Sequence, residues 1–538
     1  MSLPPSVYAA FIATAERHPD SSFVAVPVRA GRDYAPDGLE LSFGEVRSIV
    51  DGLKAKYAAA GYGPGHRVAL LLEMRPEHLF HYLALNALGC GIVPVNPDYR
   101  HDEMLYQMQH SEADLAVSVP HRVADLRAVA ADRSEKPLPV LDAIALPAQF
   151  PSPQTKPAAA APGHDTECML LYTSGTTGRP KGCVLTNFYA LNAGAWYRDI
   201  GGALTVHHGA DRFYNPLPLF HMNHGAVTVS CAILTANCLI LTERFSPNRW
   251  WEEVAQAGAT IIHYLGVVPP LLLNQPPGDF EKRHRVRFGL GAGVEPQLHK
   301  PFEDRFGFPL VEVWGMTETG RIFADCHEPR QVDTRAFGRP LPGFEAMVAD
   351  GEGREVPRGQ EGELLVRHSA AQPRHGFFSG YLKNEAATEE AWRGGWFHTG
   401  DVVRMADDGM LYFVDRMKNI IRRSGENIAA AEIEACLQAH DAVAQVAVLA
   451  APDDIREEEV MACIVPMPGH APGPDLAEAL FGWCFARLAY FKAPGWILFV
   501  DSLPTTGTQK VQKTQIFGPG EDPRSRPGIH DFRSRKKR

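Results

Sequence analysis

Residues 172–182, YTSGTTGRPKG, form the stretch that decides the fold and the chemistry expected of this chain. They follow ECMLL at 167–171, an apolar run typical of a strand, and precede the helical pattern TNFYALNAGAWY at 186–197. Three glycines, four Ser and Thr hydroxyls and one lysine here make a loop of donors that can wrap a polyphosphate. The Walker pattern is absent because Gly182 follows Lys181, which excludes a P-loop kinase or GTPase. Taken alone, the segment also fits a Gly/Thr-rich turn.

Strand-like apolar runs alternate with helical patterns on both sides of this loop, which favours an α/β fold with mixed sheets. The strand-like runs are RVALLLEM (67–74), GIVPVN (91–96), TIIHYLGVV (260–268), VRFGLGAG (286–293) and PLVEVWG (309–315), and the helical pattern EHLFHYLALNALG (77–89) lies between the first two. We expect a large, multi-lobed N-terminal domain over residues 1–415. The Pro/Ala-rich stretch 146–165 has no periodicity and predicts a surface connection, around 148–165, that separates two lobes of sheet.

A change of pattern near Asp415 predicts a small, mobile α+β domain over residues 416–516. Its expected elements are a strand pair (410–416 and 419–423), a helix (430–440), two strands (444–450 and 459–466), a helix (475–490) and a last strand (496–501). Residues 517–538 end in RSRPGIHDFRSRKKR, which is too polar and too broken by Pro and Gly to fold alone. We expect a solvated basic tail, with a specific phosphate or membrane contact as the alternative.

The composition is that of an ordinary folded protein. Of 538 residues, 45% are apolar and 22% are charged, which excludes a disordered or fibrous chain. The net charge of −10 disfavours nucleic acid or an anionic membrane as the main partner. Nine cysteines without a C-x-x-C pair or a Cys/His cluster indicate neither a disulfide framework nor a structural zinc site.

Neither a signal peptide nor a membrane span is predicted. The start of the chain lacks a basic region before an apolar core and has the pattern of a short amphipathic helix. Polar residues interrupt the longest uncharged stretch, 225–242, which predicts buried core instead of a span. We therefore expect a cytoplasmic protein.

YTSGTTGRPKG resembles the phosphate-binding signature of the adenylate-forming superfamily, which includes acyl-CoA synthetases, luciferases and peptide-synthetase adenylation domains. Six further strings match this superfamily in the expected order: PLFHMNH (218–224), GLGAGVEP (289–296), VWGMTETG (313–320), WFHTGD (396–401), VDRMKNIIRRSGENI (414–428) and LPTTGTQKVQK (503–513). Within the superfamily the chain is most similar to crotonobetaine/carnitine-CoA ligase-like acyl-CoA synthetases. That likeness rests on DRMKNIIRRSGENI, on PDDIREEEVMACIVP (452–466) and on QPP (275–277).

The resemblance implies an ATP site on loops that follow strands. VWGMTETG follows an apolar run, so its loop should lie at the carboxyl end of a strand, where α/β sheets place ligands. Glu312 would accept a hydrogen bond from the adenine amino group, Trp314 would stack on the purine, and Thr317 would bond the α-phosphate. The other residues implied at the ATP/AMP site are Thr173, Ser174, Gly175, Thr176, Thr177, Lys181, Gly291, Ala292, Gly293, Gly315, Met316 and, at the ribose, Asp401 and Arg416.

The same resemblance assigns catalysis to Lys510, His221, Thr317 and Glu318. Lys510 would stabilise the negative charge that gathers on the α-phosphoryl oxygens when a carboxylate attacks them, although Gln509 precedes it where the family usually has glycine. Glu318 offers hard oxygen ligands suited to Mg²⁺ beside the ATP phosphates. His221 would orient the substrate carboxylate or act as a gate between the acyl and ATP sites.

Simpler interpretations exist for each of these residues when it is taken in isolation. An isolated Lys510 would be a solvated surface lysine, and an isolated Glu318 a surface carboxylate. His221 would be a satisfied core histidine, and Asp401 a helix cap or turn former.

The resemblance also implies a second half-reaction in which the small domain rotates. Lys418 has the hinge position, and Gly425 permits close approach of a thiol chain. The residues implied at the CoA site are Ser424, Gly425, Glu426 and Asn427, and those at the acyl pocket are His221, Asn223 and His224.

The function implied is an AMP-forming acid–thiol ligase: an ATP-dependent carboxylic acid:CoA ligase that works through an enzyme-bound acyl-AMP. ATP, Mg²⁺ and coenzyme A are the cofactors and co-substrates, and a small carboxylic acid is the third partner; a homodimer stays open. One alternative is an adenylating enzyme that loads a carrier protein or makes acyl-adenylate without CoA. A non-catalytic nucleotide-binding module is disfavoured because Lys181, Glu318, Asp401 and Lys510 occur together.

Overall fold

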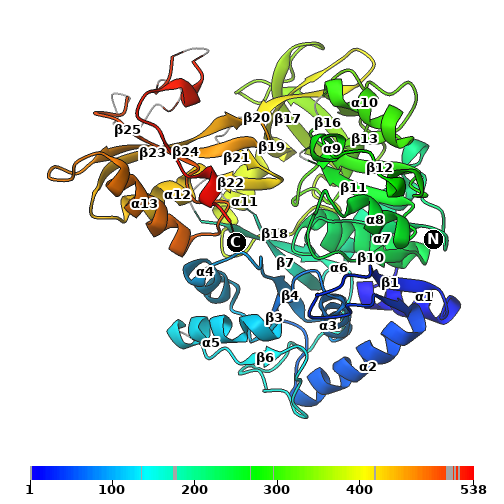
Figure 1. The fold of residues 1–538 in the computed structure, drawn as a ribbon. Helices are drawn as coiled ribbons and strands as arrows, with labels where there is room; N and C mark the ends of the chain where they lie inside the picture. The colour runs from blue at the N-terminus through cyan, green and yellow to red at the C-terminus, as the bar shows by residue number, and fades with distance from the viewer. Residues whose placement is uncertain are drawn as a thin grey trace. The chain divides into compact units, whose positions relative to one another are not determined.

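The computed structural model describes the chain except residues 1–2, 135, 174–178, 267, 295, 417–419, 505–512, 514–515, 519–520 and 538, and it leaves the side chains of 415, 416, 420, 427, 429 and 431 undescribed. The chain forms two compact units. The large unit holds residues 1–97, 107–171 and 182–415, and the small unit holds 98–106, 172–181 and 416–538. Helices and strands alternate through both, so the predicted α/β class with mixed sheets is confirmed (Figure 1).

A seven-stranded sheet is formed mainly by strands between residues 67 and 186. Its neighbouring strands β4, β3, β5 and β6 pair in parallel, and β18 adds an antiparallel edge to β8. In spatial order the strands are β18 (Gly380–Tyr381), β8 (Lys181–Thr186), β7 (Glu167–Thr173), β4 (Gly91–Pro94), β3 (Arg67–Leu71), β5 (Leu115–Ser118) and β6 (Val140–Asp142). Segment 146–165 links β6 to β7 of this one sheet, so the prediction that it separates two lobes of sheet is wrong.

An eight-stranded sheet follows, and its middle strands are parallel. In spatial order the strands are β14 (Ile322–Ala324), β13 (Leu310–Gly315), β12 (Phe288–Ala292), β11 (Ile261–Leu265), β9 (Arg212–Tyr214), β10 (Cys238–Ile240), β1 (Ser22–Val26) and β2 (Leu39–Ser42). Parallel strands need crossover connections, and α7 (Val229–Thr235), α8 (Trp250–Gln256), α9 (Val268–Leu273) and α10 (Pro296–Phe306) supply them. Because β9, β11, β12 and β13 run the same way, the loops that leave them meet at one edge of the sheet.

One apolar cluster joins these two sheets in the large unit. It includes buried residues of β3 and β12 together with residues of α1 (Val7–Arg17), α2 (Phe43–Ala60), α3 (Pro76–Ala87) and α6 (Asn187–Asp199). The predicted N-terminal amphipathic helix is α1, which Ser6 caps by accepting from the Ala9 N–H. The predicted core stretch 225–242 is buried at nearly every position. The remaining helices of this unit are α5 (Val123–Asp132) and α11 (Glu385–Ala391), while α4 (His101–Ser111) has residues in both units.

A five-stranded sheet completes the large unit, in the order β15 (Ala336–Gly338), β20 (Leu411–Arg416), β19 (Phe397–Met405), β17 (Glu361–Arg367) and β16 (Glu345–Ala349). Its pairings are antiparallel where their register is described. The sequence predicts that 410–416 pairs with 419–423, but these segments lie in different sheets, as β20 here and as β21 (Ile420–Arg423) in the small unit. The expected strand pair is therefore wrong, although both strands exist.

The small unit is built on a six-stranded sheet. Its strands are β22 (Glu426–Ala429), β21, β24 (Glu457–Pro466), β25 (Trp496–Phe499) and β26 (His530–Asp531), with β23 (Val443–Asp453) also paired to β24. Helices α12 (Ala430–Gln438) and α13 (Pro474–Arg487) bury Ile433, Leu437, Leu480 and Phe481 in the core of this unit. These elements match the predicted helices and strands between 430 and 501 to within a few residues.

The basic C-terminal segment is packed, whereas the sequence predicts a solvated tail. β26 pairs with β25 in antiparallel register, Ile497 opposite His530. Phe532 is 7% exposed and its ring stacks on Phe481 at 4.7 Å between centroids. The segment is thus the last strand of the small unit's sheet.

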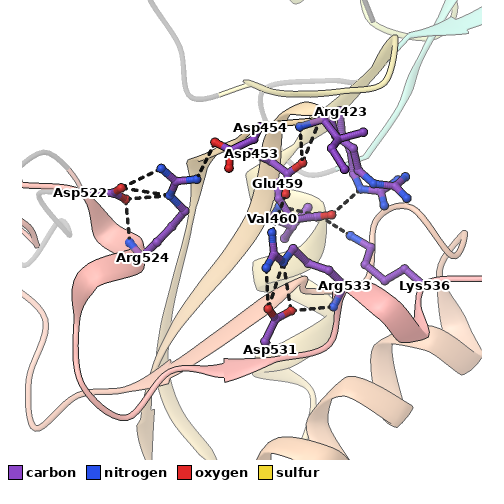
Figure 2. A network of polar contacts seen from close by, with 12 residues as sticks. Arg423, Asp453, Asp454, Glu459, Val460, Asp522, Arg524, Asp531, Arg533 and Lys536 are labelled. Atoms are coloured by element: carbon purple, nitrogen blue, oxygen red, sulfur yellow. Dashed lines mark hydrogen bonds and ion pairs between the residues drawn. The ribbon is translucent and has the colours of Figure 1, made fainter. Parts of the chain in front are cut away.

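Ion pairs join this segment to β23 and β24, as Figure 2 shows. Glu459, which is fully buried, accepts from Arg423 Nε at 2.7 Å and from the buried Lys536 ammonium. Arg533 donates to Asp453 at 2.9 Å. Burial lowers the pKa of Lys536 to about 7 although Glu459 opposes that shift. Four cations of the segment have an acidic partner far away in sequence, which a local pattern does not reveal: Arg524, Arg533, Arg535 and Lys536.

Candidate active site

The candidate site lies where the parallel strands of the eight-stranded sheet end. Residues 289–291 of β12 pair with 310–312 of β13, so the two carboxyl ends lie side by side. Open α/β sheets bind ligands at this edge, and the strings 289–296 and 313–320 both leave the sheet there. The structure therefore brings Gly291, Ala292 and Gly293 next to Glu312, as the resemblance implies.

Glu312 is held from two sides by residues of the large unit. The Gly293 N–H donates to Oε2 at 2.8 Å, and the Tyr264 hydroxyl donates to Oε1 at 3.0 Å. Burial raises the pKa of Glu312 to about 7, and His299 together with these donors opposes the shift. Glu312 thus braces the turn after β12, and its contact with an adenine amino group stays a prediction.

The glycines of this turn have steric reasons to be glycine. A Cβ on Gly291 would lie 2.4 Å from Tyr264 Cδ2 and from the Tyr264 carbonyl oxygen on the neighbouring strand β11. Gly293 has a φ of +83°, in the left-handed region that favours glycine. Close strand packing requires Gly291, whether or not a base approaches it.

Trp314 and Asp401 are joined by a hydrogen bond. The indole Nε1–H of Trp314 donates to Asp401 Oδ2 at 2.8 Å, and the two residues are 6% and 4% exposed. The indole packs at 5.6 Å on Phe323 and belongs to a buried aromatic group. Its described role is to orient the carboxylate predicted to hold the ribose; stacking on a purine stays a prediction.

Glu318 lies on the loop after β13 and is buried. The Tyr381 hydroxyl donates to its Oε1 at 2.9 Å, and the Glu318 carbonyl accepts from the Phe378 N–H at 2.9 Å. The neighbouring Thr317 carbonyl accepts from the Tyr189 hydroxyl at 2.6 Å. One rigid carboxylate is what Mg²⁺ needs from a protein when phosphates supply the other oxygens. No group of three acidic, His or Cys residues suited to a metal occurs among the described residues.

A cleft of about 490 Å³ lies beside Tyr381 and is lined by residues 374–389. Its two cations have partners in the large unit, since Arg374 donates to Glu389 and Lys383 pairs with Glu112 at 2.9 Å. Both cations that line the cleft are therefore already neutralised by an acidic partner.

His221 and His224 belong to the segment after β9. The Gly225 N–H donates to the His221 carbonyl at 2.9 Å, and a Cβ on Gly225 would meet the Leu219 carbonyl. This tight turn explains the glycine four residues after His221. Burial lowers the pKa of both His221 and His224 to about 4, so both rings are neutral at pH 7.

Asn223 begins a π-helical segment, η3 (Asn223–Thr228), and π-helical turns are frequent at functional sites. Its side-chain oxygen accepts from Asn215 at 2.9 Å and from His263 at 2.8 Å. Asn223, which is predicted to line the acyl pocket, is thereby tied to the carboxyl end of β9 and to β11, at the edge of the sheet that also carries Glu312.

The loop 172–182 is described only at its flanks. Thr173 ends β7, Lys181 begins β8, and the Pro180 carbonyl accepts from the Tyr106 hydroxyl at 2.9 Å within the small unit. Ser174, Gly175, Thr176 and Thr177 lie outside the described residues. Lys418 and Lys510 also lie outside them, and so do the side chains of Arg416 and Asn427.

The predicted CoA segment forms a tight hairpin turn in the small unit. Arg423 pairs with Glu426 across it, and Ser424 and Gly425 have φ values of +49° and +85°. A positive φ at both central residues is typical of the type I′ turn, which joins the two strands of a β-hairpin through a two-residue loop. Glu426 is half-buried, and desolvation raises the pKa of its carboxyl to about 7.

The sequence motifs do not predict three positioning residues, Tyr264, Tyr381 and Asn215. Tyr264 holds Glu312, Tyr381 holds Glu318, and Asn215 holds Asn223. Each lies in or beside an apolar strand, and nothing in its local pattern distinguishes it from a core residue.

Two family models match the chain. A model for AMP-binding enzymes matches residues 11–382, and a model for the C-terminal domain of AMP-binding enzymes matches residues 432–510. A sulfoacetate–CoA ligase of Cupriavidus necator is 32% identical over 90% of this chain and 93% of its own length. A crotonobetaine/carnitine–CoA ligase of Proteus mirabilis is 30% identical over 89% of this chain and 93% of its own.

Solved structures share the fold over nearly the full length. A double mutant of o-succinylbenzoate CoA synthetase from Bacillus subtilis, bound with a product analogue, matches with a TM-score of 0.81 and 23% identity, covering 96% of this chain and 98% of that one. An amide bond synthetase from Marinactinospora thermotolerans matches with a TM-score of 0.77 and 25% identity, covering 95% and 99%. None of the described helices is both long and apolar enough to span a membrane.

Proposed function

The chain belongs to the AMP-binding enzyme family, which confirms the resemblance drawn from its motifs, and we propose that it is an ATP-dependent carboxylic acid:CoA ligase. The reaction has two steps. The acid attacks the α-phosphorus of ATP to give an enzyme-bound acyl-AMP and pyrophosphate, and the CoA thiol then displaces AMP. The observation that carries the proposal is the set of three fixed carboxylates, Glu312, Glu318 and Asp401, around the carboxyl end of β13 in a chain with CoA ligases as relatives.

Adenylation makes a carboxylate reactive. A carboxylate is a poor acyl donor because its leaving group would be an oxide, whereas the mixed anhydride with AMP has a good leaving group. Water must be excluded, or the anhydride hydrolyses before the thiol arrives. The buried carboxylates Glu318 and Asp401 suit such a water-poor site.

In this proposal ATP is bound by residues of the loop 172–182 and by residues at the edge of the eight-stranded sheet. The hydroxyls and N–H groups of Thr173, Ser174, Gly175, Thr176 and Thr177, with the Lys181 ammonium, bind the phosphates. Residues 291–293, Glu312 and 314–316 bind the adenine side, Thr317 bonds the α-phosphate, and Asp401 with Arg416 binds the ribose hydroxyls. Glu318, fixed by Tyr381, contributes the one carboxylate that Mg²⁺ needs beside the ATP phosphates.

Lys510 and Lys418 carry two separable roles. Lys510 stabilises the charge on the α-phosphoryl group during adenylation. Lys418 is the hinge about which residues 416–516 rotate before thioester formation, so that residues 424–427 line the CoA site. Lys510→Ala should abolish adenylation and leave thioester formation from supplied acyl-adenylate largely intact, and equal loss of both steps would contradict this role. A Lys418 variant with unchanged kinetics in both half-reactions would exclude it as the hinge.

The acid is proposed to be small and to bind beside His221, Asn223 and His224. The relatives named for sulfoacetate and for crotonobetaine or carnitine act on short polar acids, which favours that class here. A panel of short, branched, aromatic, sulfonated and trimethylammonium carboxylates, assayed for AMP release with and without CoA, tests the proposal. CoA-dependent AMP release with at least one acid is the expected result, and its absence with every acid would refute it.

A second candidate is an adenylating enzyme whose acceptor is not CoA. This second candidate is supported by the likeness to an amide bond synthetase, which shares the fold over 95% of this chain. It predicts acid-dependent exchange of pyrophosphate into ATP without CoA consumption, which the same panel detects.

A reducing compartment suits either candidate. All nine cysteines are free, and eight of them are buried. We propose that the protein acts in the cytoplasm, where its substrates ATP and CoA are available.

A further inference from the structure

One backbone N–H group, that of Leu217, determines which groups donate and which accept in the hydrogen-bond network around the Asn223 side chain. The Leu217 N–H donates to Asn215 Oδ1 at 3.0 Å, and a backbone N–H can only donate. The Asn215 side chain therefore directs its Nδ2 group to the other side, where it donates to Thr228 Oγ1 at 3.0 Å and to Asn223 at 2.9 Å. The Thr228 hydroxyl in turn donates to the Asn223 carbonyl at 2.7 Å.

The donor at Asn215 Nδ2 determines the orientation of the Asn223 side-chain amide and the tautomer of His263. Because Asn215 Nδ2 is a donor, the Asn223 atom that faces it is Oδ1. The same oxygen lies 2.8 Å from His263 Nδ1, so that nitrogen carries a proton and donates. The Asn215 Nδ2 group also lies 3.2 Å from His263 Nδ1, but its two protons are already donated to Thr228 and Asn223, so this approach is a contact and not a hydrogen bond. His263 Nε2 is then an acceptor, and the Tyr197 hydroxyl donates to it at 3.1 Å. With both donors on Oδ1, the Asn223 amide cannot flip without opposing like groups.

The Asn223 Nδ2 group is consequently a donor held ready for a ligand. Among the described residues it has no hydrogen-bond partner, and Asn223 is half-buried while Asn215, Thr228 and His263 are fully buried. It lies at the edge of the sheet where ligands bind, two residues after His221.

The groups behind the Asn223 side-chain oxygen are neutral. Burial lowers the pKa of His263 to about 3 and that of His224 to about 4, so neither ring is charged at pH 7. Asn215, Thr228 and Tyr197 carry no charge. The orientation of the amide is therefore kept across neutral pH, and an acceptor oxygen of a ligand would satisfy its Nδ2 donor.

We propose that Asn223 determines acyl specificity by donating a hydrogen bond from Nδ2 to an acceptor oxygen, such as a keto or ether oxygen, on the acyl chain beyond its carboxylate. This inference rests on the proposed ligase function and names its substrate class. Asn215 and His263 are positioning residues, because they orient the amide and do not touch the acid.

The experiment compares pairs of acids of equal length, each a keto or ether acid and its alkanoate counterpart, in CoA-dependent AMP release by the full-length enzyme. Asn223→Asp keeps an oxygen for Asn215 and His263 but replaces the donor with an acceptor. The wild type should have a kcat/KM at least about tenfold higher for the acceptor-bearing acid of the best pair, and Asn223→Asp should lose that preference. Hydroxy acids, which can donate, should lose less in Asn223→Asp than keto acids do.

Asn248→Asp, at an exposed position of the same unit, is the control for added negative charge and should keep the wild-type ratio. If Asn223→Asp does not fold, Asn223→Ser removes the donor and is judged by the same ratio. Equal kcat/KM within every pair for the wild type, or a preference that survives in the Asn223 variant, would overturn the inference and leave the ligase function standing. No CoA-dependent AMP release with any acid would overturn the ligase function and, with it, this inference.

Discussion

The Trp314 indole donates a 2.8 Å hydrogen bond to the Asp401 carboxylate, so the end of β13 orients a side chain on β19. The two residues are 87 positions apart and both are almost completely buried. A carboxylate whose orientation is fixed in this way pays less conformational entropy when it binds the ribose hydroxyls.

Trp314→Phe should therefore weaken ATP binding, because it keeps an aromatic ring in the cluster but removes the donor. We expect the KM for ATP to rise about tenfold with a smaller change in kcat, the cost of one hydrogen bond to a charged group. Trp483→Phe is the control, since it also removes an indole donor, here half-buried, whose acceptor is the Cys436 carbonyl. Steady-state kinetics with ATP varied measure both, and an unchanged KM in Trp314→Phe would contradict the role given to this hydrogen bond.

Gly291→Ala should destabilise the large unit even without nucleotide. The added methyl group would meet Tyr264 at 2.4 Å, which is overpacking and costs about 1–3 kcal/mol. Gly278→Ala, where a methyl group meets nothing within 4 Å, should change the free energy of unfolding by less than about 0.5 kcal/mol. Urea unfolding of the nucleotide-free proteins measures the free energy of unfolding of both variants. Equal values for the two would mean that strand packing does not require Gly291.

Glu312 should make the stability of the protein depend on pH. Burial raises its pKa to about 7 from an ordinary value of 4.5, so between these values the folded chain keeps a proton that the unfolded chain releases. The free energy of unfolding that this group contributes is present below pH 4.5 and is lost as the pH rises through 7.

Glu312→Gln removes that titration and keeps a polar group for Gly293 and Tyr264. Relative to the variant, the wild type should lose up to about 3 kcal/mol between pH 4.5 and pH 8. Urea unfolding at pH 5, 6, 7 and 8 measures the difference, in which Glu426 cancels because both proteins keep it. Parallel profiles of the two proteins would show that Glu312 does not titrate in this range.

Phe532→Ala should release the C-terminal segment. The ring stacks on Phe481 in the core of the small unit, and removing a buried phenylalanine costs about 3 kcal/mol. Trypsin should then cut between residues 524 and 537 at least about tenfold faster than in the wild type, as mass spectrometry of the fragments reports. Arg526→Ala, which changes an exposed residue of the same segment, should have little effect on cleavage at the other sites. Equally rapid cleavage of the wild type would contradict the packing of this segment and would support the predicted solvated tail.

Much of the fold can be predicted because its signals are local. The apolar run 309–315 and the helical pattern 77–89 each match a strand or helix of the structure, β13 and α3, because periodicity within a dozen residues determines both. The strand at 410–416 is also found, but its partner is not 419–423, because sheet membership depends on residues far away in sequence.

The candidate site is predicted in its residues and not in its contacts. The motifs indicate Glu312, Trp314, Glu318 and Asp401, yet nothing in them predicts that Trp314 bonds Asp401 or that Tyr381 bonds Glu318. The prediction of a solvated C-terminal tail is wrong for the same reason. Lys536 has the sequence pattern of a solvated lysine, and only the fold places Glu459 beside it. Long-range pairs of this kind follow from packing, which a single sequence does not display.

We expect ATP to be cleaved between its α- and β-phosphorus atoms while the acid is captured on the nucleoside side. Incubation with ATP labelled at the α-phosphorus, an acid of the panel and CoA, followed by separation of the products, tests it most directly. The account predicts labelled AMP in amounts equal to the acyl-CoA formed, with unlabelled pyrophosphate. Labelled ADP with orthophosphate would contradict it.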